Sequence, residues 1–341
     1  MSFKKLALAA VATSALLLTS AYAEGIKDPN IDAYYQTFKG KTIAFVPVAM
    51  GFDLTEGWAA GIRQQTNALG MKFEVRDPNW STAAGAQAIT SLIAEKPSVM
   101  VIHNPDVQSY AHLLRKAQAA GIYVVQVNME SSFPTDAYVG ADWHQIGATA
   151  AQAVVKACGT GSGKSGKVAI VQGVLTAAAS AYQVNGVYDV LSKHPEIKIV
   201  SNQAGDWDAS KARSITATVL QQNPDLCGII GFWDGMDTGT AAAIKEAGKT
   251  GLVFLVTSGG GADGACTNVE NGTFSEDISY DVPGQARDMN NMIKTLLESH
   301  LKPGTLHLSL YTPLKIITKA DMTPTSCWNL KALQKAATAT D

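Results

Sequence analysis

The sequence predicts an α/β protein built from two doubly wound lobes, each a parallel sheet with helices on both faces. Two observations support this prediction: the strands are apolar throughout, and amphipathic helical segments alternate with them from residue 41 almost to the end. Strands of this type are buried on both faces, as in parallel sheets. The apolar strands are Thr42–Val46, Ser98–Ile102, Tyr123–Val127, Val168–Val171, Cys227–Phe232 and Leu252–Val256.

In the first half, apolar side chains recur at helical spacing between the strands. Trp58, Ile62 and Leu69, for example, share one helical face. Gly70 and Gly121 stand where helices are expected to end. The pattern predicts strands over 41–48, 71–77, 98–103, 122–128 and 136–141, and helices over 54–69, 84–96, 108–120 and 144–158.

A glycine-rich break at 159–166 separates the first series from a second that repeats the same plan. The length of the chain suits two domains of ordinary size. The second series predicts strands over 167–172, 197–203, 227–232, 252–257 and 273–279, helices over 180–193, 209–222, 237–247 and 284–299, and an extended stretch over 306–318.

The N-terminus, residues 1–23, reads as a cleaved signal peptide. Lys4 and Lys5 precede an apolar core over 6–18, and Ala21-Tyr22-Ala23 forms a small-x-small cleavage site. The core is shorter than the roughly 20 residues that span a bilayer. Cleavage removes two lysines and no acid, so the formal net charge of −2 becomes −4. The charge of this mildly acidic, exported chain does not favour binding to nucleic acid or to an anionic membrane.

Four cysteines in an exported chain permit no, one or two disulfides, and Cys266 with Cys327 is the favoured pair. Neither the cysteines nor the six histidines show metal-type spacing, so we expect no metal and no cofactor.

Residues 158–165 resemble a P-loop motif, but they follow a helix and precede a strand, whereas a P-loop follows a strand and precedes a helix. No G-x-S-x-G elbow or defensible acid–base pair is present, which favours a binding protein over an enzyme.

Aromatic and polar side chains follow the predicted strands at their carboxyl ends, where such folds bind ligands. Aromatic planes stack on the C–H faces of sugars, and Asp and Asn side chains accept hydrogen bonds from hydroxyl groups. We therefore expect a pocket for a small polyhydroxylated solute at this edge. The candidates are Phe52, Asp53, Trp80, His103, Asn104, Asn128, Met129, Glu130, Asp142, Trp143, Trp207, Trp233, Asp234, Ser258, Tyr280 and Asp281.

From about residue 41 to 319 the chain resembles the periplasmic sugar-binding proteins of the ribose-binding type, which are solute receptors of ABC importers with the type I periplasmic binding protein fold. The order and spacing of several segments carry the resemblance. They are Phe52-Asp53 before the first helix, 119–125, Val139–Asp142, Val171-Gln172-Gly173, Gly205–Asp208 and Gly231–Met236.

The resemblance implies two lobes joined by a three-strand hinge, with the ligand held in the cleft between them. The lobes would comprise 41–141 with 283–308 and 142–281 with 312–330, and the chain would cross near Asp142, Asp281 and Tyr311. The expected function is that of a periplasmic monomer that captures a small neutral sugar or polyol and delivers it to a membrane permease.

The family's site residues carry over with departures. Phe52 and Asp53 match its first-lobe contacts, and Trp207 matches its second-lobe aromatic. The chain lacks several charged residues of the family: Asn128-Met129 stand in place of an Asp-Arg pair, Ser258 in place of an Asp, and Tyr182 lies where an Arg is often found nearby. These losses imply a neutral ligand that is smaller or more linear than a pyranose.

Other functions remain open at this point. A signalling receptor for chemotaxis or quorum sensing has the same fold, and an exported hydrolase could use the same two-lobed scaffold. The same cluster of Trp and Asp side chains also suits a quaternary ammonium ligand through cation–π contacts. A DNA-binding repressor of related fold is set aside, because a leader occupies the place of its helix-turn-helix.

Overall fold

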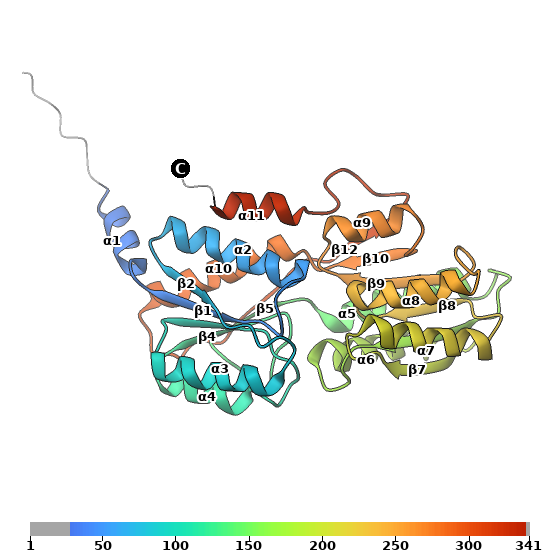
Figure 1. Cartoon of the computed structure of the whole chain (residues 1–341), viewed down its shortest axis with the longest axis horizontal. Coiled ribbons are helices and arrows are strands. Elements are labelled where there is room, and N and C mark those ends of the chain that lie inside the picture. The colour runs from blue at the N-terminus through green and yellow to red at the C-terminus, as the bar shows by residue number, and fades with distance from the viewer. Residues whose placement is uncertain (1–27, 339–341) are drawn as a thin grey trace, which may run out of the picture.

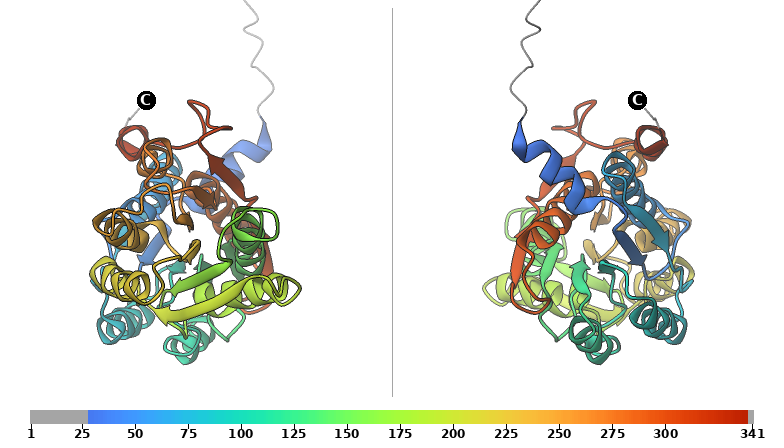
Figure 2. Two further views of the ribbon diagram at one scale, coloured as in Figure 1. Left: turned by 90° about the vertical axis from the view of Figure 1, so that its right-hand side faces the viewer. Right: turned by 90° about the vertical axis from the view of Figure 1, so that its left-hand side faces the viewer.

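The computed structural model describes residues 28–338, which form two α/β lobes side by side along the long axis of the molecule (Figure 1). The predicted leader, residues 1–23, lies outside the described residues. Each lobe has a sheet with helices on both faces, as the end-on views in Figure 2 show. The predicted fold class is therefore confirmed. Within 28–338, no helix has both the length and the apolar character needed to cross a membrane.

The first sheet and its helices draw on the first half of the chain and on two later segments. They are α1 (Pro29–Phe38), β1 (Thr42–Val46), α2 (Asp53–Ala68), β2 (Lys72–Val75), α3 (Thr82–Glu95), β3 (Val99–Ile102), α4 (Ala111–Ala119), β4 (Tyr123–Val127), β5 (Ala137–Gly140), α10 (Val282–Ser299) and β11 (Leu308–Tyr311).

The second sheet is formed by the second βα series and one late strand. Its elements are α5 (Trp143–Cys158), β6 (Lys167–Gln172), α6 (Ala178–Leu191), β7 (Lys198–Ala204), α7 (Ala209–Gln222), β8 (Gly228–Gly231), α8 (Asp234–Glu246), β9 (Phe254–Gly259), α9 (Asp263–Glu270), β10 (Glu276–Ser279) and β12 (Lys315–Thr318).

The two sheets share one plan, with strand orders β11-β5-β4-β3-β1-β2 and β12-β10-β9-β8-β6-β7. The central strands are buried along their whole length, as predicted, whereas edge strands β2 and β7 are only half-buried. All neighbouring strands are parallel except β12, which runs antiparallel to β10. Only residues 312–314 separate β11 from β12. A strand that crosses so directly enters the second sheet from its carboxyl edge, so it must run against its neighbour.

Three helices were not among the predicted elements: α1, α9 and α11 (Leu330–Thr338). In α1 only Phe38 is buried, and in α11 only Ala337, so neither helix buries a broad apolar face. Helix α11 leaves the second lobe and packs on α2 of the first (Figure 1). The Asn67 side chain donates to the carbonyl of Ala337 at 3.2 Å. The C-terminal segment therefore joins the two lobes.

Two disulfides are formed. The predicted pair Cys266–Cys327 is confirmed and ties α9 to the segment that precedes α11. A second disulfide, Cys158–Cys227, joins the end of α5 to the residue before β8. Since α5 ends at Cys158 and β6 begins at Lys167, the glycine-rich stretch between them is a helix-to-strand turn, as predicted, and not a P-loop.

Candidate ligand-binding site

A small cavity lies between the lobes at the carboxyl edges of both sheets. Its volume is about 30 Å³, room for about two water molecules. Nine of the predicted site residues line it: Phe52, Trp80, His103, Asn128, Met129, Trp143, Trp207, Trp233 and Tyr280. A larger hollow of about 670 Å³ adjoins this cavity and shares Val48, Trp80, Met129 and Trp207 with it. A sugar-sized solute can therefore enter the inner cavity only when the lobes part.

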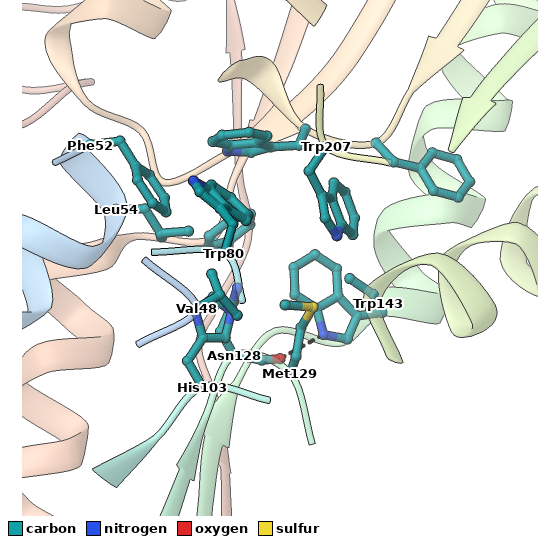
Figure 3. A pocket seen from close by; sticks show the side chains of 13 residues that line it. Val48, Phe52, Leu54, Trp80, His103, Asn128, Met129, Trp143 and Trp207 are labelled. Atoms are coloured by element: carbon teal, nitrogen blue, oxygen red, sulfur yellow. Dashed lines mark hydrogen bonds between the residues drawn. The ribbon is translucent and has the colours of Figure 1, made fainter. Parts of the chain in front are cut away.

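Four aromatic side chains, two from each lobe, meet across the cleft (Figure 3). Phe52 and Trp80 of the first lobe are stacked, with ring centroids 5.5 Å apart and planes 16° from parallel. Trp233 of the second lobe meets Phe52 edge-on at 5.5 Å and lies 6.3 Å from Trp80. Trp207 contacts Trp233 edge-on at 6.4 Å. Such rings offer flat apolar faces to a bound ring.

Phe52 and Trp233 have the same local setting, although they follow non-equivalent strands of the two sheets, β1 and β8. Each is the extended N-cap residue of a helix that follows a central strand, α2 for Phe52 and α8 for Trp233. An aspartate follows each of them, and its carboxylate accepts a hydrogen bond from the next backbone N–H: Asp53 at 2.8 Å and Asp234 at 2.7 Å. The helix N-terminus favours a carboxylate at this point. These aspartates therefore lie beside the cavity without lining it.

Trp80 and Trp207 occupy the same position in the two lobes, since each follows the equivalent edge strand of its sheet, β2 and β7. Both lie in the left-handed region, with φ of 66° and 63°, and each is preceded by a residue in the same region. Bulky residues rarely adopt this conformation, which costs about 1–3 kcal/mol per residue and clusters at ligand sites. Two equivalent strained turns thus aim one indole from each lobe into the cleft.

Glycines make room for the two indoles of the second lobe. A Cβ at Gly173 would lie 2.0 Å from the ring of Trp207, and a Cβ at Gly235 would lie 2.4 Å from the ring of Trp233. No side chain fits at such distances, so the ring of Trp207 lies directly on the backbone at the end of β6. Gly173 is therefore a residue that positions Trp207.

Two polar side chains of the lining are free to bind a ligand. His103 is only 2% exposed and packs edge-on against Trp58 at 5.1 Å. Burial lowers the pKa of His103 to about 3, so its ring is neutral. Within residues 28–338, neither nitrogen of this ring has a hydrogen-bond partner, and neither does Oδ1 of the buried Asn128. Unpaired buried polar groups are costly and call for a partner.

Other predicted site residues have structural roles away from the cavity. The Asp142 side chain caps α5 by accepting from the Gln145 N–H at 2.9 Å. Asn104 donates to the Gln126 side chain and to the Met129 carbonyl, both at 2.9 Å. The buried Ser258 hydroxyl donates to the carbonyl of Phe232 at 3.2 Å.

Three more predicted residues also lie outside the cavity. Glu130 and Tyr182 line a separate surface hollow beside β5 and β11. Asp281 precedes α10 in a left-handed conformation, with a φ of 52°, at a passage between the lobes. Glu130 and Asp281 follow strand ends and Tyr182 lies in α6, but sequence position does not say where their side chains point.

The sequence also missed four apolar residues of the lining: Val48, Leu54, Ala179 and Phe232. Val48 and Leu54 flank the predicted Phe52 in sequence, and Phe232 directly precedes Trp233. Aliphatic and phenyl side chains are common in cores, so they carry no ligand signal without neighbours in space. For Val48, Leu54 and Phe232, the available signal in the sequence was their closeness along the chain to the predicted aromatic residues.

Four aspartates gather beside the cavity: Asp53, Asp234, Asp237 and Asp277. Asp237 accepts from the hydroxyls of Thr257 at 2.6 Å and Thr240 at 2.9 Å. Neither oxygen of the fully buried Asp277 has a partner in the described part of the chain. No ion pair within 28–338 reaches any of the four, nor do His, Cys, Asp and Glu residues there gather into a metal site. Burial, followed by the charges of Asp277 and Asp53, raises the pKa of Asp234.

We expect the melting temperature to fall as the pH rises from 5 to 8. Burial raises the pKa of Asp237 and of Asp277 from 3.8 to about 7. The native state then holds more protons than the unfolded state between about pH 4 and 7, so stability decreases as the pH rises through this window. Differential scanning fluorimetry at constant ionic strength measures the effect, and Asp277→Asn should flatten the slope. A melting temperature that rises over this range would contradict the assignment.

Comparisons with known proteins agree with this architecture. The sequence profile of the family described as periplasmic binding protein domain matches residues 43–301. The D-allose-binding periplasmic protein of Escherichia coli (strain K12) is 32% identical over 153 residues, 42% of this chain and 48% of that protein. A D-apiose import binding protein of Actinobacillus succinogenes is 23% identical over 199 residues, 58% of this chain and 63% of that protein. The chain thus matches less than two thirds of the length of these curated relatives.

Solved structures show the same fold. An ABC transporter solute binding protein from Agrobacterium vitis, bound with α-D-tagatopyranose, superposes with a TM-score of 0.74 at 22% sequence identity. The superposition covers 84% of this chain and 97% of that chain. The predicted resemblance to periplasmic sugar-binding proteins of the ribose-binding type is confirmed, and the protein belongs to the periplasmic binding protein domain family.

Proposed function

We propose that this protein is the periplasmic solute receptor of an ABC importer and that it binds a small neutral sugar or polyol in the cleft between its lobes. The observation that carries the proposal is the uncharged lining of the cavity, in which aromatic side chains of both lobes face one another. Proteins that are related to it in part of their sequence bear the names of sugar-binding receptors, among them the D-allose-binding and D-apiose import binding proteins.

Within the proposed site, Trp207, Trp233 and Phe52 form the walls that enclose the ligand ring. His103 and Asn128 supply hydrogen bonds, because their buried polar atoms lack partners in the described chain. Asp53 and Asp234, which lie beside the cavity, reach the ligand only if the cleft rearranges around it. No acid–base pair is needed for this role, so we propose capture and release without chemistry.

The proposed receptor is exported with its leader, which is then cleaved. It acts as a monomer and delivers its ligand to the membrane permease. The proposed lobes, 41–141 with 283–308 and 142–281 with 312–330, turn about three short connections. The first follows β5 at Gly140, the second follows β10 at Ser279, and the third is the link 312–314. Short connections of this kind allow hinge closure over a ligand.

A thermal-shift screen against sugars, polyols and quaternary ammonium ions tests the proposed ligand class. A ligand present at 100 times its dissociation constant stabilises the native state by about 2.7 kcal/mol. The proposal expects a rise in melting temperature with at least one neutral sugar or polyol. A rise with quaternary ammonium ions alone would show that the ligand is a cation and not a sugar or polyol. Turnover of a stabilising compound would show that the protein is an enzyme and not a receptor.

Small-angle X-ray scattering tests the hinge. At saturating ligand we expect the radius of gyration to decrease, because the lobes must part to admit a solute and close again around it. The C-terminal segment, tied to α9 by Cys266–Cys327 and packed on α2 through α11, should limit how far the lobes part. Truncation after Cys327 should therefore increase the difference in radius of gyration between the free and the ligand-bound protein. An unchanged radius of gyration with and without ligand would argue against closure.

A further inference from the structure

We infer that the cavity selects a ring that carries few hydroxyl groups, such as a deoxy or O-alkyl sugar or a cyclic alcohol, over fully hydroxylated monosaccharides. The inference rests on the proposed function and narrows its ligand class. It comes from comparing the hydrogen bonds that a buried ligand needs with those that the lining can provide.

A common sugar needs many hydrogen-bond partners when it is buried. A hexopyranose carries a hydroxyl group on nearly every ring carbon, and each hydroxyl is one donor and two acceptors. A cavity enclosed between two lobes removes water from these groups. Every hydroxyl that is buried without a partner then loses affinity, because its bonds to water are not replaced.

The lining offers few hydrogen-bonding groups, since apart from the indoles only His103, Asn128 and Tyr280 carry polar side chains. The neutral His103 ring offers one donor and one acceptor, and both of its nitrogens lack a partner within residues 28–338. Asn128 offers its free Oδ1 as an acceptor. The Tyr280 hydroxyl already interacts with the Asn128 side chain, so the lining can match about two or three ligand hydroxyls.

Several neighbouring polar groups are already occupied. The indole N–H of Trp143 donates to the carbonyl of Asn128 at 2.8 Å, and the same carbonyl accepts from the Tyr138 hydroxyl at 2.9 Å. The Asn104 amide nitrogen and the Ser258 hydroxyl already donate to other groups, as described above, whereas Asn104 Oδ1, outside the lining, has no partner within residues 28–338. Figure 3 shows the bond between Trp143 and Asn128 as a dashed line, with His103 and Met129 close to Asn128 in the lower part of the view.

The rest of the lining is apolar: Val48, Phe52, Leu54, Met129, Ala179 and Phe232, with the faces of the indoles. A ring hydroxyl directed at these groups finds no partner, whereas a C–H or methyl group there buries apolar surface favourably. The polar residues His103 and Asn128 both come from the first lobe, at the ends of β3 and β4. The selected ring should therefore have its hydroxyls along one edge and apolar groups on the opposite side.

Isothermal titration calorimetry of the mature protein with matched pairs tests this inference. Each pair differs in one hydroxyl: D-galactose with D-fucose, D-mannose with D-rhamnose, and D-glucose with 6-deoxy-D-glucose. In at least one pair the deoxy member should bind tenfold or more tightly than its partner. In a carbocyclic series, a cyclohexanediol should bind more tightly than myo-inositol.

A lining variant sharpens the test. Met129→Asn adds a hydrogen-bonding group to the apolar floor and should shift the preference toward the hydroxylated member of the pair, whereas Met129→Leu should keep the preference for the deoxy member. Equal or tighter binding of the fully hydroxylated partner throughout would overturn the inference and leave the proposed function intact. Binding of no sugar or polyol in either series would contradict the proposed function itself, and the inference with it.

Discussion

Trp207→Ala is expected to weaken binding of the captured solute by about a hundredfold. The indole forms one wall of the cavity and contacts Trp233. Its loss removes about 2–3 kcal/mol of apolar burial and stacking, and each 1.4 kcal/mol changes the dissociation constant about tenfold. Isothermal titration calorimetry with the solute found in the thermal-shift screen measures the change.

Two further variants separate the role of the ring from general damage to the lobe. Gly173→Ala leaves the indole in the chain but pushes it from its place, because the new Cβ would lie 2.0 Å from the ring; it should weaken binding nearly as much. Tyr188→Ala removes an exposed aromatic from α6 of the same lobe and should not change affinity. If Trp207→Ala and Gly173→Ala both bind like the parent, the ligand site lies elsewhere.

Removing the disulfide Cys158–Cys227 should destabilise the protein by about 4 kcal/mol. It closes a loop with a sequence separation of 69, and a loop of this size restricts the unfolded chain by about that amount. The double variant Cys158→Ala with Cys227→Ala should melt about 10 °C lower than the parent. Thermal unfolding followed by circular dichroism, without reductant, measures the difference.

The matched comparison is Cys266→Ala with Cys327→Ala. That pair has a similar sequence separation of 61, but both of its cysteines are half-buried. Cys158 and Cys227 are 1% and 2% exposed, so their truncation also leaves a gap in the core and should cost more. A melting temperature unchanged by loss of the buried pair would show that this disulfide does not form.

The fold could be predicted largely from its central strands. Strands such as Val99–Ile102 are apolar at every position because both of their faces are covered, and such runs stand out in a sequence. The direction of β12 could not be predicted, since periodicity says nothing of which way a strand runs. Helices α1 and α11 are only 10 and 9 residues long and bury a single side chain each, so little in their packing distinguishes them from connecting segments.

The candidate site was predictable in position but not in side-chain direction. Trp207 and Trp233 follow strands whose carboxyl ends meet at one edge, so their approach could be expected. Asp142 follows a strand in the same way, yet its carboxylate caps α5. A short acidic side chain at a helix start can serve either the helix or a ligand, and the sequence alone does not separate the two. Asp277 was missed because it lies within a buried strand.

Native mass spectrometry of the mature protein with a mixture of neutral sugars, polyols and quaternary ammonium ions tests the central claim most directly. The account predicts a one-to-one adduct with an uncharged sugar or polyol. The adduct should keep the intact mass of the solute after prolonged incubation and be lost in Trp207→Ala. An adduct with the ammonium ions alone, or release of a solute of altered mass, would contradict the account of a carbohydrate receptor that performs no chemistry.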